Sequence, residues 1–229
     1  MAQTDFNVHQ ERIDAYQHPD YWIAYLHLYR YLFARRYCYG IVLDACCGLG
    51  YGTHFLSNSK RIQKVVGVDI DSYSVRYALQ KYSNLKTAFL ATDLSTPTFP
   101  DKIFDSIVFL ECLEHLNKPQ LVLRNLHRIL KSGGLIILST PNRTNLYNMI
   151  NRHSLSNPYH VREYSISDVR ELMTCSGFEI IGVEGEALPP PFVMRLKFLR
   201  TNRQLVKLFC HWVRALPRYA FYQILLARA

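Results

Sequence analysis

Short apolar runs alternate with segments of helical character along most of this chain. Before residue 142 there are five such runs, and each ends at a polar residue or a glycine cluster, as buried strands do where they enter turns. The predicted strands are residues 41–45, 64–68, 87–91, 104–110 and 135–139. Because helical patterns separate most of them, the chain predicts a parallel sheet covered by helices on both faces.

Three helices are predicted among these strands. The first occupies residues 51–59, and the second spans residues 72–82, with Ser72 in a position to cap it. The third begins at Pro119, carries an apolar stripe on one face and is expected to stop at the pair Gly133-Gly134.

The two ends of the chain depart from this alternation. Residues 12–39 are rich in Tyr, Leu and Ala and predict a helical segment interrupted near Pro19. After the fifth strand, residues 167–176 predict a helix, and residues 178–183 and 221–227 predict two further strands. The predicted sheet therefore has seven strands.

The composition is that of an ordinary globular domain. Hydrophobic residues make up 49% of the 229 residues and charged residues 20%, so we expect one domain over residues 1–229. No run of about 18 apolar residues occurs, as a membrane span would need. The first ten residues are polar, unlike a signal peptide. We therefore expect a cytoplasmic protein.

The cysteines provide no metal or disulfide motif. None of the six forms a CxxC pair, and neighbouring cysteines such as Cys46 and Cys47 seldom reach bridge geometry. We therefore expect no metal site and a set of buried free thiols. The cysteines are Cys38, Cys46, Cys47, Cys112, Cys175 and Cys210.

The net charge of +9 is concentrated in one segment. Eight of the nine excess positive charges lie after Glu186, where no acidic residue follows. Residues 203–216 place Leu and aromatic side chains on one helical face and basic side chains on the other. Three interpretations remain open for this segment: a lid on the domain, a contact with an anionic membrane through residues 193–216, or a contact with RNA phosphates. No RNA-binding module is recognisable, so nucleic acid is not the expected partner.

Acidic residues end the first three predicted strands, where a parallel sheet binds ligands. Asp44 precedes a glycine loop that contains Gly48 and Gly50, and Asp69 and Asp93 end the next two strands. A carboxylate at such a position can accept hydrogen bonds from ribose hydroxyls or an adenine amino group. The dinucleotide pattern G-x-G-x-x-G requires glycine at position 53, which is Thr53, so a nicotinamide oxidoreductase is disfavoured.

Five segments in order resemble the motifs of class I S-adenosylmethionine-dependent methyltransferases. The first motif, D/E-x-G-x-G-x-G, is matched from Asp44, with Cys46 where glycine is usual, and Ser132 replaces a proline in the last. The segments are residues 44–50, 66–69, 91–94, 104–108 and 130–135. The resemblance covers about residues 28–187. It implies a Rossmann-like α/β fold with a seven-stranded, mostly parallel sheet and an antiparallel C-terminal strand.

The resemblance also implies the cofactor S-adenosylmethionine, its product S-adenosylhomocysteine and a division of the chain. The regions are a helical segment (1–39), a cofactor-binding core (40–187), a basic amphipathic insertion (188–218) and a terminal strand (219–229). Glycines at 48 and 50 would line the methionine part, Asp44 would lie near its amino group, and Asp69 would bind the ribose. The full set of implied cofactor residues is Asp44, Cys46, Gly48, Gly50, Asp69, Ile70, Asp93, Leu94 and Glu111.

Two stretches carry candidate acceptor-site residues. Residues 111–115 follow the fourth strand and include Glu111 and His115, and residues 157–164 follow the fifth and include His160. A histidine titrates near pH ~6.5 and suits proton abstraction near neutrality. His160 is favoured as the base, with His115 and Glu111 as the other catalytic candidates. Arg162 and Glu163 are expected to form a solvated pair.

A narrower resemblance bears on the acceptor. Residues 28–34, 50–52, 111–115, 139–142 and 157–164 resemble small methyltransferases associated with bacterial surface-glycan synthesis. This similarity favours O-methylation of a sugar or another small hydroxylated acceptor, at the inner face of a membrane if the basic segment binds lipid. An RNA methyltransferase and a non-catalytic protein that binds the cofactor or a partner are the alternatives.

Overall fold

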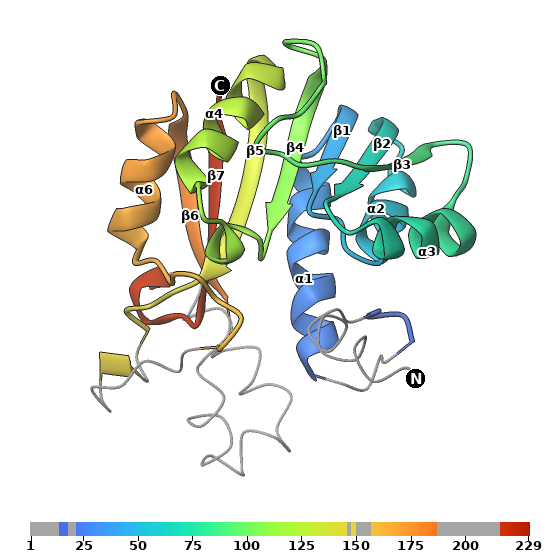
Figure 1. Cartoon of the computed structure of the whole chain (residues 1–229). Coiled ribbons are helices and arrows are strands. Elements are labelled where there is room, and N and C mark those ends of the chain that lie inside the picture. The colour runs from blue at the N-terminus through green and yellow to red at the C-terminus, as the bar shows by residue number, and fades with distance from the viewer. Residues whose placement is uncertain (1–13, 18–21, 146–147, 150–156, 187–215) are drawn as a thin grey trace.

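The structure is a computed structural model that describes residues 14–17, 22–145, 148–149, 157–186 and 216–229 (Figure 1). Its helices are α1 (Trp22–Tyr37), α2 (Tyr51–Ser57), α3 (Ser72–Tyr82), α4 (Pro119–Ile129) and α6 (Ile166–Thr174), with short 3-10 helices η1 (Leu113–His115) and η2 (Pro217–Tyr219). The strands are β1 (Gly40–Ala45), β2 (Ile62–Asp69), β3 (Thr87–Ala91), β4 (Phe104–Leu110), β5 (Leu130–Pro141), β6 (Glu179–Glu186) and β7 (Tyr222–Arg228).

The seven strands form one sheet in the order β3-β2-β1-β4-β5-β7-β6. Pairs among β1 to β5 are parallel, and β7 runs antiparallel to both of its neighbours. The predicted mixed sheet with an antiparallel C-terminal strand is confirmed. Strand order reverses between β1 and β4, and a sheet of this kind binds ligands at the carboxyl ends beside such a reversal.

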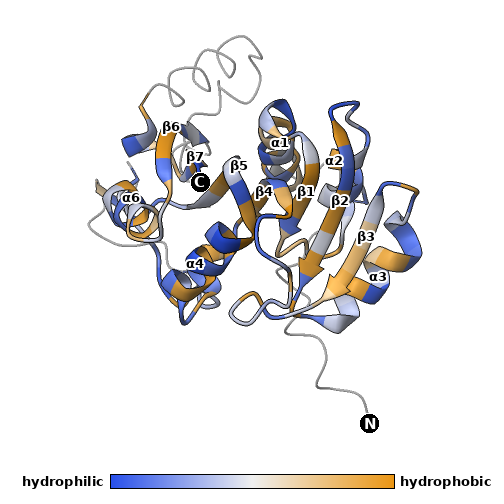
Figure 2. Ribbon diagram, turned by 90° about the horizontal axis from the view of Figure 1, so that it is seen from above, coloured by the Kyte–Doolittle hydropathy of each residue, from blue (hydrophilic) through white to orange (hydrophobic). Residues whose placement is uncertain are grey.

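Alternate residues of the strands feed two hydrophobic cores on opposite faces of the sheet. Val42, Val108 and Ile137 pack with side chains of α1, α2 and α3. Their neighbours Leu43 and Ile107 pack with side chains of α4 and α6 on the other face. Figure 2 shows α1 and α2 on one side of the sheet and α4 and α6 on the other. Burial on both faces explains why these strands read as continuous apolar runs.

Two predicted helix boundaries are wrong. The N-cap of α3 is Asp71, whose carboxylate accepts hydrogen bonds from the backbone N–H groups of Tyr73 and Ser74, and Ser72 is the first helical residue. The glycine pair does not stop α4, which ends at Ile129. Gly133 instead has a left-handed backbone conformation (φ +76°) inside β5, at an irregularity in its pairing with β4. Glycine is needed at this position because of its left-handed backbone conformation, and it has no role in ending the helix.

Several expectations fall on residues that the structure does not describe. The interruption near Pro19 and residues 188–215 of the predicted basic insertion (188–218) lie outside the described ranges, so their interpretations stay predictions. The division of the chain into regions likewise stays a prediction. Among the helices that are described, none has the length and apolar character needed to cross a membrane.

Candidate functional site

A cavity of about 780 Å³ opens where β1, β2 and β4 end, a volume within the usual range for small-molecule sites. Eight of the expected site residues line it: Cys46, Gly48, Asp69, Ile70, Asp93, Leu94, Glu111 and His115. Three do not, namely Asp44, Gly50 and His160. Residues for which the sequence predicted no individual role also contribute, among them His27, Arg30, Tyr31, Tyr51 and Tyr159.

The loop after β1 exposes its backbone to this cavity. Gly48 has a φ of +53°, and a Cβ placed on it would meet nothing within 4 Å, so a ligand can approach the chain closely. Cys46 also has a positive φ, of 63°. This conformation explains why glycine is usual at its position in the motif. Gly50 begins α2, and a Cβ there would lie 2.4 Å from that of Ala78, so this glycine serves helix packing.

Asp44 lies beneath the loop, with 1% of its surface exposed. Its carboxylate accepts hydrogen bonds from the hydroxyl of Thr53 at 2.6 Å and from that of Tyr31 at 3.2 Å. Burial raises the pKa of Asp44 to about 7, although both hydrogen bonds act in the opposite direction. Asp44 thus links the end of β1 to Tyr31 of α1 and Thr53 of α2, and its expected place near the amino group of the cofactor stays a prediction.

Asp69 both holds the loop and faces the cavity. One carboxylate oxygen accepts from the backbone N–H of Gly48 at 2.9 Å, and the other accepts from that of Asp71 at 3.0 Å. Each carboxylate oxygen has two lone pairs and can accept more than one hydrogen bond, as binding to ribose hydroxyls would require. The next residue, Ile70, is 71% exposed at the rim of the cavity. An apolar side chain so exposed is suited to cover a flat aromatic ring.

Asp93 and Leu94 form the opposite rim. Asp93 accepts a hydrogen bond at 2.7 Å from the backbone N–H of Ser95, which lowers the pKa of Asp93 and keeps its carboxylate ionised. Leu94 is buried and lines the cavity. With Ile70, these residues provide an apolar slot with one acceptor at its edge, as an adenine and its amino group require.

The expectation of free thiols is wrong for two cysteines. Cys46 and Cys112 form a disulfide with their Cα atoms 6.3 Å apart. The reason is tertiary: β1 and β4 are adjacent parallel strands, so the loops that follow them lie side by side. Cys38 and Cys47 are buried free thiols, Cys175 is free but exposed, and Cys210 lies outside the described residues. The disulfide joins the two loops that flank the cavity.

A buried arginine is the main site residue that the sequence did not indicate. Arg30 of α1 is 1% exposed, and its Nε donates to Glu186 at 2.6 Å. Its Nη1 lies 3.6 Å from a carboxylate oxygen of Glu111, and neither Nη1 nor Nη2 has a hydrogen-bond partner among the described residues. Arg30 also lines the cavity. A buried guanidinium with two unpaired nitrogens is costly and indicates an anionic ligand group.

Two carboxylates, those of Glu111 and Glu186, lie against the single guanidinium of Arg30. Burial raises the pKa of Glu186 to about 7 even though Arg30 opposes this. Burial and the nearby Glu111 also raise the pKa of Glu114 well above its ordinary value. Glu111 itself has a φ of 50°, and one of its oxygens accepts from Ser139 at 2.7 Å. Backbone strain of this kind is concentrated at functional sites.

The two candidate histidines meet at the far end of the cavity. The rings of His115 and His160 are T-shaped, with centroids 5.1 Å apart. His115 Nδ1 lies 3.1 Å from the backbone carbonyl of Tyr159, and His160 Nδ1 lies 3.1 Å from a carboxylate oxygen of Glu163. The side chain of Glu163 is 10% exposed, so the expectation that it lies in solvent is wrong. The structure thus brings together two histidines that are 45 residues apart in the sequence.

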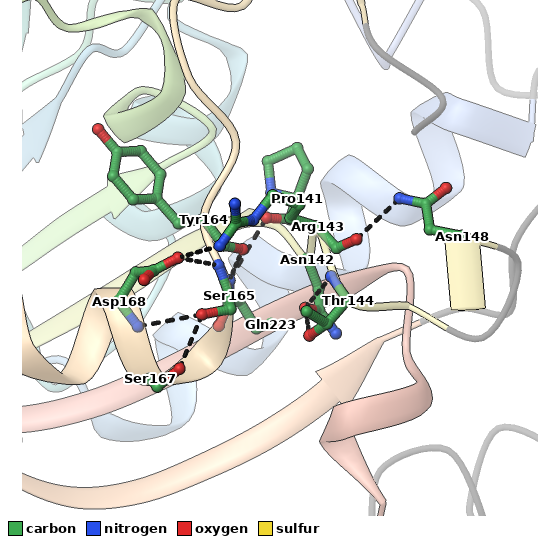
Figure 3. Close-up of polar contacts among 10 residues, drawn as sticks. All are labelled: Pro141, Asn142, Arg143, Thr144, Asn148, Tyr164, Ser165, Ser167, Asp168 and Gln223. Atoms are coloured by element: carbon green, nitrogen blue, oxygen red, sulfur yellow. Dashed lines mark hydrogen bonds and ion pairs between the residues drawn. The ribbon is translucent and has the colours of Figure 1, made fainter. Parts of the chain in front are cut away.

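The loop that carries His160 is anchored by the residues that follow this histidine. On one side, backbone N–H groups of Val161 and Arg162 both donate to the carbonyl of Glu114. On the other, the carbonyl of Tyr164 accepts from the backbone of Arg143 and from the side chain of Gln223, each at 3.0 Å. Figure 3 shows this second anchor, where the end of β5 meets the first residues of α6.

The start of α6 strengthens the same anchor. Ser165 and Asp168 cap the helix reciprocally, each side chain accepting from the other residue's backbone N–H. Asp168 also accepts from Arg143 at 3.0 Å (Figure 3). These contacts fix the direction in which the histidine loop leaves the sheet.

Comparison with known proteins identifies the domain. Residues 43–138 match a family model described as a methyltransferase domain. Over 139 residues the chain is 31% identical to a probable S-adenosylmethionine-dependent methyltransferase of Mycolicibacterium smegmatis, a match that covers 61% of this chain and 52% of the relative. These matches support a class I S-adenosylmethionine-dependent methyltransferase domain in this chain. It spans about half the length of the curated relatives it matches.

Solved methyltransferases share the fold at low sequence identity. A SAM-dependent methyltransferase from Archaeoglobus fulgidus superposes with a TM-score of 0.63 at 20% identity, covering 89% of this chain and 91% of that one. The [4+2]-cyclase SpnF superposes with a TM-score of 0.65 at 21% identity, covering 90% and 82%. The methyltransferase fold therefore accommodates more than one chemistry, and the activity has to be argued from the site.

Proposed function

We propose that this methyltransferase methylates a hydroxyl group of a sugar or of a similar small acceptor. The observation that carries the proposal is the continuity of the cavity, which runs from Asp69 and Asp93 at one end to Glu111 and His115 at the other. Such a cavity can hold a nucleoside cofactor and an acceptor in line.

The cofactor end fits the adenosine of S-adenosylmethionine. Asp69 would accept hydrogen bonds from the ribose hydroxyls, and Asp93 would accept from the adenine amino group. Ile70 and Leu94 would enclose the adenine ring. The open backbone at Gly48 and the volume of the cavity support this arrangement.

Arg30 would hold the carboxylate of the methionine part. Its Nη1 and Nη2 atoms, which lack hydrogen-bond partners among the described residues, form a fork that matches a carboxylate with two parallel hydrogen bonds. The nearby Glu111 supplies negative charge next to the cationic amino group and sulfonium. Arg30 would thus face the negatively charged carboxylate of the ligand, and Glu111 would face its positively charged groups.

At the acceptor end of the cavity, a side chain would remove the proton of the acceptor hydroxyl. S-adenosylmethionine supplies a methyl group on a positively charged sulfur, so the protein chiefly provides alignment, which can contribute on the order of 7–11 kcal/mol. A hydroxyl acceptor also has to lose its proton, for which a positioned group contributes about 10²–10⁴-fold. His160 with Glu163 has the arrangement of a base oriented by a carboxylate, and His115 lines the cavity.

The test combines cofactor binding with an acceptor screen. Calorimetry should show binding of S-adenosylmethionine and S-adenosylhomocysteine but not of NAD. Incubation with S-adenosylmethionine and a panel of sugars, nucleotide sugars and amines should yield S-adenosylhomocysteine and a methyl ether only with hydroxylated acceptors. Methylation confined to amines, or to RNA added in the same assay, would refute the proposed acceptor class.

A further inference from the structure

The acceptor end of the cavity contains a set of side chains with the geometry of a metal site. Glu114, His115 and His160 each offer one ligand atom, and these atoms all lie within 4.8 Å of one another. We propose that the three side chains bind one divalent cation of borderline softness, such as Zn²⁺, beside the acceptor position. The proposal deepens the proposed function, on which its role in the reaction rests.

In each imidazole the hydrogen bond at Nδ1 leaves the Nε2 atom for a metal. The carbonyl of Tyr159 and the carboxylate of Glu163 can only accept hydrogen bonds, so each histidine Nδ1 must carry the hydrogen. The Nε2 atoms of the neutral rings are then unprotonated and can act as ligands. Histidines that bind metals almost always donate their other N–H to a carbonyl or a carboxylate in this way.

The neighbourhood of His160 Nε2 is consistent with this tautomer. The side-chain amide nitrogen of Asn157, a donor, lies 3.2 Å from it. A bound cation would replace that contact with a stronger one. Asn157 and Glu163 together favour the tautomer with its hydrogen on Nδ1, which leaves the Nε2 lone pair for a ligand bond.

Glu114 supplies the third ligand from a position that water does not reach. Its side chain is 1% exposed, and one carboxylate oxygen accepts from the hydroxyl of Thr140 at 2.8 Å. Glu111 and Arg30 are the charged side chains that act on it. Glu111 and Glu186 already share the guanidinium of Arg30, so a cation at Glu114 would add positive charge where two carboxylates face one arginine.

The ligand set corresponds to a catalytic rather than a structural metal. Two histidines and one glutamate leave one position open on a tetrahedral ion, with bonds of about 2.0–2.2 Å. The three side chains would therefore converge slightly on binding. The cavity lies on the side of His115, so the acceptor hydroxyl could take the open position.

In the cation-bound protein the two histidines would be ligands, and the ion would assist proton loss. The hydroxyl proton would pass to water as the acceptor oxygen forms its bond to the methyl carbon and the carbon–sulfur bond of the cofactor breaks. The products are a methyl ether and the neutral thioether S-adenosylhomocysteine, so the charges balance.

The experiment uses Co²⁺ as a spectroscopic probe and needs neither cofactor nor acceptor. Protein treated with a chelator and dialysed should bind one Co²⁺ per chain, with visible absorption bands of a four- or five-coordinate ion that Zn²⁺ abolishes. His160→Ala and Glu114→Gln should each weaken binding by more than about 100-fold. Glu163→Gln, which alters only the group that orients His160, should weaken it by about 10–100-fold.

Two controls separate this proposal from the others. His54→Ala removes a histidine of α2 that lies outside the cavity and should leave Co²⁺ binding unchanged. Calorimetry with S-adenosylhomocysteine should give wild-type affinity in His160→Ala, which shows that the variant is folded and the cofactor site intact. The proposal is overturned by the absence of stoichiometric Co²⁺ binding, or by binding that His160→Ala and Glu114→Gln leave unchanged. Either result would leave the methyl transfer itself untouched.

Discussion

At the scale of single residues, Asp69 has two roles that a substitution would remove together. Its carboxylate secures the backbone of Gly48 and Asp71, and in the proposed function it also binds the ribose. Asp69→Ala would leave these backbone donors and the ribose hydroxyls without an acceptor. We expect calorimetry to show S-adenosylmethionine and S-adenosylhomocysteine bound more than about tenfold more weakly. Asp101→Ala, at an exposed carboxylate paired with Arg128, is the control, and an unchanged affinity in Asp69→Ala would reject the ribose assignment.

Arg30 allows a test that separates ligand binding from structural support. Arg30→Lys keeps a positive charge between Glu111 and Glu186 but loses the planar fork. We expect the affinity for S-adenosylmethionine to fall by about tenfold. Methylthioadenosine, which lacks the amino-acid carboxylate, should bind the variant as tightly as the wild type. An equal loss for both ligands in calorimetry would show that Arg30 acts only by supporting the fold.

The sequence could not identify Arg30, and the reason is physical. Its importance comes from the burial of its guanidinium and from Glu186, which lies 156 residues further along the chain. The same holds for the disulfide between Cys46 and Cys112 and for the contact between the rings of His115 and His160. Strand-end carboxylates, by contrast, are adjacent in space whenever parallel strands are adjacent, so Asp69 and Asp93 could be placed from the pattern alone.

At the scale of elements, the apolar runs located the strands well, because a strand buried on both faces must be apolar throughout. The predicted spans 87–91 and 104–110 are those of β3 and β4. The prediction was weaker where glycine or serine was taken as a helix boundary. Asp71, one residue before Ser72, caps α3, and Gly133 lies at an irregularity in the pairing of β5 with β4, which a helix pattern does not reveal.

The turn from β1 into α2 provides a prediction about helix packing. Gly50 and Gly133 both have left-handed backbones, with φ of +83° and +76°, but only at Gly50 would a Cβ collide with α3. Gly133→Ala should therefore lose about 1–2 kcal/mol for its conformation alone. Gly50→Ala should lose about 1–3 kcal/mol more through overpacking. Urea unfolding measures both, and equal losses would contradict the packing role of Gly50.

At the scale of the whole molecule, the burial of Asp44 links stability to pH. The pKa of Asp44 is raised to about 7, so between about pH 4 and pH 7 the folded protein holds a proton that the unfolded chain has released. The free energy of unfolding therefore falls as pH rises through this window, by at most about 1.4 kcal/mol per pH unit. Glu186, with a pKa also raised to about 7, acts in the same direction.

Asp44→Asn isolates this contribution, because asparagine resembles the protonated side chain in shape. Relative to the wild type, the variant should gain stability steadily from about pH 4.5 to about pH 7. Urea unfolding at several pH values measures the difference, and Asp101→Asn, at an exposed position, should show no such trend. A constant difference between wild type and Asp44→Asn would mean that the buried carboxyl does not titrate in this range.

The position of β7 in the sheet has a consequence for how the protein is made. This strand, residues 222–228, lies between β5 and β6 and is the only neighbour of β6 among the described strands. A ribosome therefore releases the first six strands before it supplies the one that joins them. During that interval one edge of β5 is unpaired and β6 has no strand to pair with. Nascent chains with such exposed strand edges readily pair with one another. Chaperone binding should accordingly persist until residues 222–228 have left the ribosome.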